Sequence, residues 1–171
     1  MSNYQHILND ISTIIATKNC HIHWDLIDEA YIFEIKKTNV VISYIQLYSS
    51  TGNITPKYKH DYIETEVFNI TYLFTELIYR NQGFALLLLI YGICYIKMLF
   101  PYVNYAILDD NSDKHNQMIN IYNIIGFTFR DIIKLDMEHN NKIMPSGPEK
   151  QLAINHNFIL RVYHILNKKF Y

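Results

Sequence analysis

An uncharged, apolar run over residues 84–96 places the strongest limit on the fold of this chain. It ends at Lys97 after 13 residues, whereas a helix that spans a membrane needs roughly 20 apolar residues. Pro101 predicts the end of the helix, because proline cannot continue the backbone hydrogen bonding of a helix. We therefore expect a helix buried in a protein core and no membrane segment.

Length and composition indicate one globular domain, residues 1–171, since the chain is long enough to bury one core and half of its residues are hydrophobic. A net charge of −1 provides no basic surface for phosphates, so we expect no nucleic-acid partner. Cys20 and Cys94 form no CxxC pair and the first residues lack the layout of a signal peptide, which favours a reduced, cytoplasmic protein. The many Ile, Asn, Tyr and Lys residues are typical of AT-rich genomes, such as those of some large DNA viruses.

The spacing of apolar residues predicts the elements of the first part of the chain. Residues 4–17 carry apolar side chains at helical spacing and predict an amphipathic helix. Strands are predicted at 20–27, 30–36 and 40–48. We expect a loop over 49–61, where Gly52 and Pro56 lie among polar residues.

The second part of the chain predicts strands alternating with helices. Strands are expected at 64–76, 105–108, 127–137 and 155–166, and helices at 83–100 and 113–125. Residues 137–155 are polar and form a long connection for a compact domain, so we expect them to border a binding site. The alternation, flanked by antiparallel hairpins, predicts a mixed α/β sheet.

Two short motifs carry the functional information. The first is Arg80-Asn81-Gln82-Gly83-Phe84-Ala85, between the strand-like run and the apolar helix. The second is Tyr122-x-x-x-Gly126-Phe127, whose tyrosine follows Arg80 by 42 residues. Together they resemble the signature segments of the GNAT superfamily of N-acetyltransferases, which read Arg/Gln-x-x-Gly-x-Gly/Ala and Tyr-x-x-x-Gly-Phe.

The resemblance implies an α/β (α+β) fold with a central mixed, mostly antiparallel twisted sheet of about six to seven strands and about three to four flanking helices. It implies an acyltransferase that uses acetyl-CoA to acetylate a primary amine by direct attack on the thioester. The first third fits less well, since a typical member begins with a strand where this chain begins with a helix.

The resemblance also assigns the cofactor contacts. A pyrophosphate binds unpaired backbone N–H groups at a helix N-terminus, and the strand before the loop leaves backbone groups for the pantetheine arm. The residues at these positions are Leu73, Phe74, Thr75, Arg80, Asn81, Gln82, Gly83, Phe84, Ala85 and Leu86. His115 stands seven residues before Tyr122, where many members carry an asparagine that meets the cofactor.

The resemblance further implies that Tyr122 is the general acid, which protonates the departing thiolate. For the base that deprotonates the amine, Asp110 is the first candidate, since it follows the strand at 105–108, where several members of the superfamily that this chain resembles carry a Glu. The adjacent Asp109 is an alternative to it. Glu76 and Glu66 are rivals, and a chain of water molecules is an alternative to any of them.

Several functional alternatives stay open at this point. The acceptor is a small amine, an amino sugar, or a protein N-terminus or lysine. The alternative to an enzyme is a non-catalytic binding or dimerisation module that keeps the fold and binds CoA. The uncharged helix and the 15 Tyr and 9 Phe are compatible with a homodimer. Cys20-His21-Ile22-His23 has no second ligand pair, so we expect no metal.

Overall fold

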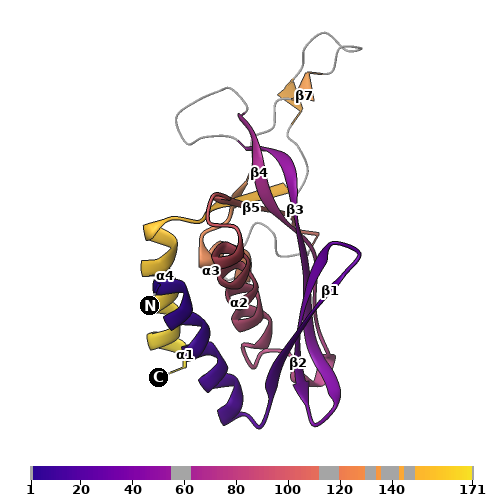
Figure 1. Cartoon of the computed structure of the whole chain (residues 1–171), viewed down its shortest axis with the longest axis vertical. Coiled ribbons are helices and arrows are strands. Elements are labelled where there is room, and N and C mark those ends of the chain that lie inside the picture. Colours follow the sequence, from indigo (N-terminus) through magenta and orange to yellow (C-terminus); the bar gives the residue numbers. More distant parts are fainter. Residues whose placement is uncertain are drawn as a thin grey trace.

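The computed structural model describes residues 2–54, 63–111, 120–129, 134–135, 143–144 and 149–170. Its centre is a seven-stranded sheet in the order β1-β2-β3-β4-β5-β9-β6 (Figure 1). These strands are β1 (His21–Ile27), β2 (Ala30–Lys37), β3 (Val40–Ile54), β4 (Ile63–Thr75), β5 (Tyr105–Asp109), β9 (Glu149–Ala153) and β6 (Thr128–Phe129). Within the sheet β4 and β5 run parallel, and the other neighbouring pairs are antiparallel. The expected mixed, mostly antiparallel sheet is confirmed.

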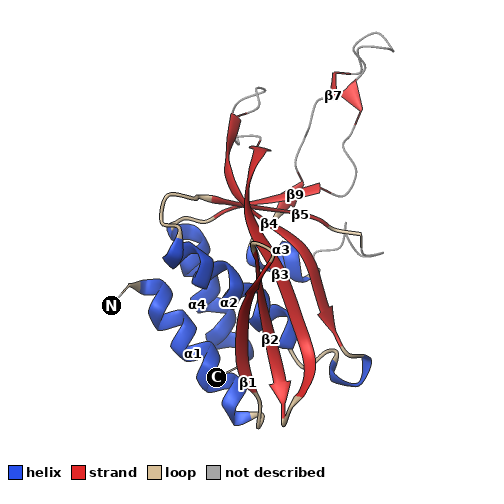
Figure 2. Cartoon of the chain, turned by 45° about the vertical axis from the view of Figure 1, so that its right-hand side comes forward, coloured by secondary structure: helices blue, strands red, loops and turns tan. Residues whose placement is uncertain are grey.

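The helices are α1 (Asn3–Thr17), α2 (Phe84–Leu99), α3 (Ile121–Ile125) and α4 (His156–Lys169), with a short 3₁₀ turn, η1 (Leu77–Tyr79). Figures 1 and 2 show α1, α2 and α4 together on one side of strands β1 to β3. Helix α2 packs against β2, β3, β4 and α1, and α4 packs against α1 and α3. Helix α2 therefore lies between the sheet and a further layer of helices.

Burial explains why residues 84–96 of α2 are apolar on nearly all sides. The side chains of Leu87, Leu88, Leu89 and Ile90 are fully buried. Gly92 lets the helix approach the sheet closely, because a Cβ atom there would lie 3.2 Å from Cδ2 of Leu47. Among the described residues, no helix is both long and apolar enough to cross a membrane.

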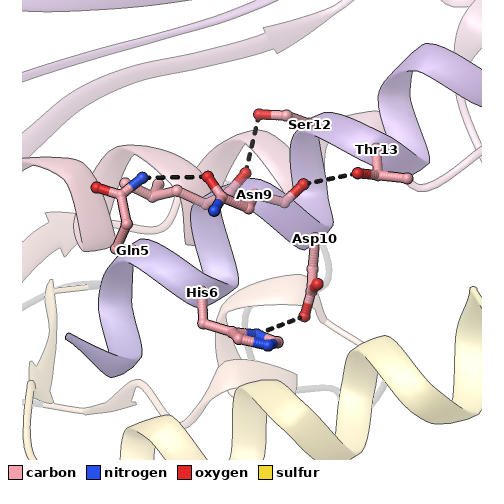
Figure 3. Close-up of polar contacts among 7 residues, drawn as sticks. Gln5, His6, Asn9, Asp10, Ser12 and Thr13 are labelled. Atoms are coloured by element: carbon pink, nitrogen blue, oxygen red, sulfur yellow. Dashed lines mark hydrogen bonds and ion pairs between the residues drawn. The ribbon is translucent and has the colours of Figure 1, made fainter. Parts of the chain in front are cut away.

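Helix α1 is amphipathic, as its spacing predicts. Its inner face buries Ile7, Leu8, Ile11, Ile14 and Ile15. The helix also carries polar contacts between residues four apart (Figure 3): Nδ1 of His6 lies 3.1 Å from Oδ2 of Asp10, and Gln5 Nε2 donates to Oδ1 of Asn9 at 3.1 Å. Such pairs stabilise a helix modestly. The helix ends at Thr17, and Lys18 is its C-cap residue.

Two predictions about elements were wrong. Residues 155–166, expected as a strand, belong to α4, whose buried residues Phe158, Ile159, Val162, Ile165 and Leu166 have helical spacing. Asn155 caps this helix, since its side chain accepts hydrogen bonds from the backbone of Asn157 and Phe158. The expected loop from residue 49 begins later, because β3 continues to Ile54 in register with β4.

Three further predictions fall partly on residues outside the described set. Of the helix expected at 113–125, the structure describes Ile121–Ile125. Of the strand expected at 127–137, it describes β6 and β7 (Lys134–Leu135), and β7 pairs with β8 (Ile143–Met144) in a separate two-stranded ladder. The connection expected over 137–155 was wrong in part, because Glu149–Ala153 form β9, which lies between β5 and β6 in the main sheet. Most of the remainder lies outside the described residues, and its role at a binding site stays a prediction.

Candidate active site

The end of β4 separates from its neighbour β5. Pairing with β5 runs from Phe68 to Ile70, whereas β4 continues to Thr75 along β3. The buried Ser43 of β3 holds this end, because its hydroxyl donates to the Phe74 carbonyl at 2.8 Å and lies 2.8 Å from Oγ1 of Thr75. The last residues of β4 thus have one edge paired with β3, while the opposite edge, on the side of β5, is not paired with β5.

The loop after β4 turns sharply into α2. Asn81 and Gly83 both have left-handed backbone angles, with φ of 62° and 85°, a region that Asn and Gly occupy more easily than other residues. Nε of Arg80 donates to the Thr75 carbonyl at 3.0 Å, which ties the loop to the end of β4. The turn directs the first residues of α2 toward the separated strand end.

The first N–H groups of α2 have no acceptor in the described part of the chain. The amide of Leu87 is the first to bond within the helix, to the Gly83 carbonyl at 3.0 Å. The amides of Phe84, Ala85 and Leu86 precede it, and Gly83 provides no side-chain cap. Unpaired amides and the helix dipole together favour an anion at this position.

These elements enclose a pocket of about 950 Å³, within the usual size of ligand pockets. The strand end, the loop and the start of α2 line one part of it, through Leu73, Phe74, Thr75, Arg80, Asn81, Gln82, Gly83, Phe84, Ala85 and Leu86. The structure thus brings together every residue that the resemblance assigned to the cofactor, except His115, which lies outside the described residues. Tyr122 and its neighbours Ile121 and Ile124 line the same pocket.

The second motif forms a one-turn helix that fixes Tyr122. Asn120 caps α3 by accepting a hydrogen bond from the Tyr122 amide at 2.8 Å. Gly126 ends the helix at φ 109°, and the amides of Gly126 and Phe127 return to the Tyr122 carbonyl. The Phe127 ring then packs edge-on against Tyr122, with centroids 6.0 Å apart. Burial raises the pKa of Tyr122 to about 12, and the charge of Asp110 acts in the same direction.

Asp110 does not line this pocket; it belongs to a buried polar cluster behind Tyr122. Its Oδ2 lies 2.6 Å from Nζ of Lys150 and accepts from Nδ2 of Asn120 at 2.7 Å. Lys150 also donates to Oδ1 of Asn123 at 2.9 Å, and its ammonium lies 6.0 Å from the centroid of the Tyr122 ring. The Asp110 carboxylate, which follows β5, therefore contacts Asn120 at the start of α3 and Lys150 in β9.

Lys150 was missed in the sequence. The one available signal was alternation, since Lys150 and Leu152 are the inward residues of β9. A single lysine in a strand gives no indication of its partner.

The rival carboxylates occupy different surroundings. Glu76 is exposed and directly follows Thr75, and its amide donates to the Ile42 carbonyl at 2.9 Å. Glu66 lies opposite Thr51 near the other end of β4, away from the pocket. Across the described residues, no cluster of three or more His, Cys, Asp or Glu side chains is arranged to hold a metal ion.

Comparison with solved structures finds similar folds at low sequence identity. AtaT complexed with acetyl-methionyl-tRNAfMet has a TM-score of 0.53 at 12% identity, covering 87% of this chain and 79% of that one. AtaTR bound with AcCoA has a TM-score of 0.51 at 13% identity, covering 85% and 76%. KacTA in a DNA complex has a TM-score of 0.52 at 9% identity, covering 80% and 74%. No protein-family model and no curated protein sequence matches this chain.

The strand topology and these neighbours show that the chain has a GNAT-like fold. At such identities the comparison establishes the fold alone. The activity has to be argued from the residues of the site.

Proposed function

We propose that the chain is an N-acetyltransferase that transfers an acetyl group from acetyl-CoA to a primary amine. The observation that carries this proposal is one pocket that joins the unpaired amides at the start of α2, the separated end of β4 and the Tyr122 side chain. The solved neighbour with bound AcCoA supports the choice of cofactor.

Different residues of the pocket bind different parts of the cofactor. The amides that open α2 bind the pyrophosphate, and Gly83 allows close approach because it has no side chain. The backbone of Leu73, Phe74 and Thr75 binds the amide-rich pantetheine arm along the strand edge that β5 leaves. Arg80 stabilises the loop through Thr75 and adds a positive charge beside the phosphates.

The reaction is a direct displacement. The amine nitrogen attacks the thioester carbonyl, the new C–N bond forms, and the C–S bond breaks to release the thiolate. The amine loses one proton to a base, and Tyr122 acts as the acid at the departing sulfur through its hydroxyl. An ordinary thiol has a pKa of about 8.5, so a phenol with a pKa of about 12 stabilises the developing thiolate mainly by donating a hydrogen bond.

The surroundings of the carboxylates favour Glu76 as the base. Glu76 does not line the pocket, but it is exposed to solvent directly after the pocket residue Thr75, where it can accept the proton through water. The Asp110 carboxylate is 1% exposed and already accepts from Lys150 and Asn120. We assign Asp110 a positioning role, which acts on Tyr122 through the Asn120 cap.

The acceptor is proposed as a primary amine without assignment to a small molecule, an amino sugar or a protein. The tRNA and the DNA are found in complexes of those neighbouring proteins, and we do not assign either ligand to this chain. The net charge of −1 favours an acceptor other than a nucleic acid.

Thermal unfolding with CoA and with acetyl-CoA tests the cofactor. A ligand at 100 times its Kd stabilises the native state by about 2.7 kcal/mol, which raises the Tm of a chain of this size by about 5–10 °C. Thiol release with a panel of amines then tests transfer. Tyr122→Phe should keep the Tm shift and lower turnover by about 10²- to 10⁴-fold.

Each result has a distinct meaning. The absence of any Tm shift would contradict cofactor binding. A Tm shift without turnover on any amine would favour the alternative, a module that binds CoA without catalysis. Full turnover by Tyr122→Phe would remove Tyr122 from the reaction.

A further inference from the structure

Two terminal helices complete the far wall of the pocket. Lys18 is the C-cap residue of α1, and Lys169 is the last residue of α4. Both line the pocket, together with Phe170. Neither lysine was singled out by the sequence motifs, since each lies more than sixty residues from the loop at Arg80.

Lys18 and the neighbour of Lys169, Phe170, both contact the cofactor loop or the start of α2. The Lys18 ammonium lies 5.6 Å from the centroid of the Phe84 ring, at the first residue of α2. The Phe170 ring lies against Gly83, so closely that a Cβ atom there would be 2.7 Å from the ring. Lys169 directly precedes Phe170, is exposed and lines the same pocket.

The charged side chains among the described residues that line the pocket are all positive. Lys18, Arg80 and Lys169 reach it from three different elements. Among the described residues, neither Lys18 nor Lys169 forms an ion pair with a carboxylate. The α2 amides suit a diphosphate, which leaves two cations without an assigned anion. A phosphomonoester carries about −1.5 to −2 charges at neutral pH and matches two ammonium groups.

We propose that Lys18 and Lys169 bind the phosphomonoester on the ribose of the cofactor, so that the pocket selects a 3′-phosphorylated ADP derivative over its dephosphorylated form. The inference rests on the proposed function, because it places the diphosphate at the start of α2. The ribose 3′-phosphate of CoA follows that diphosphate in the molecule, on the side away from the pantetheine. The two terminal helices thus determine nucleotide selectivity, while β4 and α3 serve the thioester end.

Calorimetric titration with CoA and with 3′-dephospho-CoA, at one fixed ionic strength, tests this. The wild-type chain should bind CoA about tenfold or more tightly than 3′-dephospho-CoA. Lys18→Met and Lys169→Met should each weaken CoA binding about three- to tenfold and leave the affinity for 3′-dephospho-CoA unchanged. The double variant should bind both ligands about equally.

Lys168→Met is the matched control. Lys168 lies in the same last turn of α4 but does not line the pocket, so this variant should keep the wild-type ratio. It also accounts for any general effect of a cation at the C-terminal end of the helix.

The outcomes separate the two proposals. Equal binding of the two ligands by the wild-type chain, or an undiminished ratio in the double variant, would overturn the role of the lysines and leave the acetyltransferase proposal standing. If neither ligand binds the wild-type chain, the proposed cofactor site is itself wrong and this inference falls with it. Loss of the ratio in Lys168→Met as well would show a nonspecific charge effect and would also overturn it.

Discussion

The Lys150 ammonium lies 2.6 Å from the Asp110 carboxylate, and both side chains are fully buried. The pair joins β9 to the end of β5, and Asn120 extends it to the start of α3. Because Asn120 also caps the helix that carries Tyr122, the position of the phenol depends on this buried pair. A buried charge whose partner is removed is strongly destabilising.

We expect Lys150→Met to lower the free energy of unfolding by about 3–5 kcal/mol, because it leaves the Asp110 carboxylate buried without its cation. The double variant Lys150→Met with Asp110→Leu should recover much of this loss, since no buried charge remains. Urea unfolding measures both.

Lys36→Met is the control for the loss of an ion pair as such. Lys36 pairs with Glu34 at 2.8 Å, and both side chains are partly exposed, so its replacement should change stability by less than about 1 kcal/mol. Equal effects of the two lysine substitutions would contradict a structural role for the buried pair.

The pKa of Tyr122 gives a second prediction. Its value of about 12 in the folded chain exceeds the ordinary 10.0, so the unfolded chain loses this proton first. The stability that comes from burying the neutral phenol is therefore complete below pH 10 and decreases as the pH rises toward 12. Urea unfolding of the wild-type chain and of Tyr122→Phe across this range should show the difference between them shrinking.

Asp110→Asn should lower the pKa of Tyr122, since the charge that helps to raise it is removed. NMR of chains carrying ¹³C-labelled tyrosine measures the titration, and Tyr122→Phe identifies the resonance among the 15 tyrosines. An unchanged Tyr122 titration in Asp110→Asn would show that this carboxylate does not act on the phenol.

Gly83 should tolerate no larger residue. Its φ of 85° costs an L-residue about 1–2 kcal/mol, and a Cβ would meet the Phe170 ring at 2.7 Å. Gly83→Ala should therefore lower the Tm and remove the Tm shift caused by CoA. Adding Phe170→Ala relieves the contact and should recover part of the stability, but the strained backbone angle remains. A Gly83→Ala variant with normal stability and CoA binding would contradict the described loop.

The helices and strands that were predicted correctly are those whose sequence pattern is local. The strand expected at 20–27 is β1, and the helix expected at 83–100 is α2, because alternation and a continuous apolar run are properties of neighbouring residues. Helix α4 was missed because its apolar residues are partly β-branched and aromatic, which favours a strand when short windows are considered.

The residues of the candidate site were likewise predictable only where they lie in a local motif. The cofactor loop and Tyr122 were recognisable because each lies in a compact motif. Lys150 was not, because its burial depends on Asp110 and Asn120, from which it is 40 and 30 residues away in the sequence. Lys169 was not recognisable either, because it lines the pocket from the end of α4, far in the sequence from Gly83, which the Phe170 ring contacts.

Ser43 and Thr75 should stabilise the separated end of β4. The Ser43 hydroxyl is buried and contacts both the Phe74 carbonyl and the Thr75 hydroxyl. Ser43→Ala leaves these two groups without that partner and should lower the free energy of unfolding by about 1–3 kcal/mol. It should also weaken CoA binding, because the pantetheine arm is proposed to follow this strand edge. Calorimetric titration with CoA checks the binding.

A double-mutant cycle with Thr75→Val separates the two contacts of Ser43. The combined loss should be smaller than the sum of the single losses, since both variants remove the same hydroxyl pair. Thr71→Val is the matched control on the same strand: its hydroxyl donates to the Gln46 carbonyl at 3.4 Å in an exposed position, so its removal should change stability by less than about 0.5 kcal/mol. If Thr71→Val weakens CoA binding as much as Ser43→Ala does, the strand end is not held by the buried pair, and the proposed path of the pantetheine arm loses its structural basis.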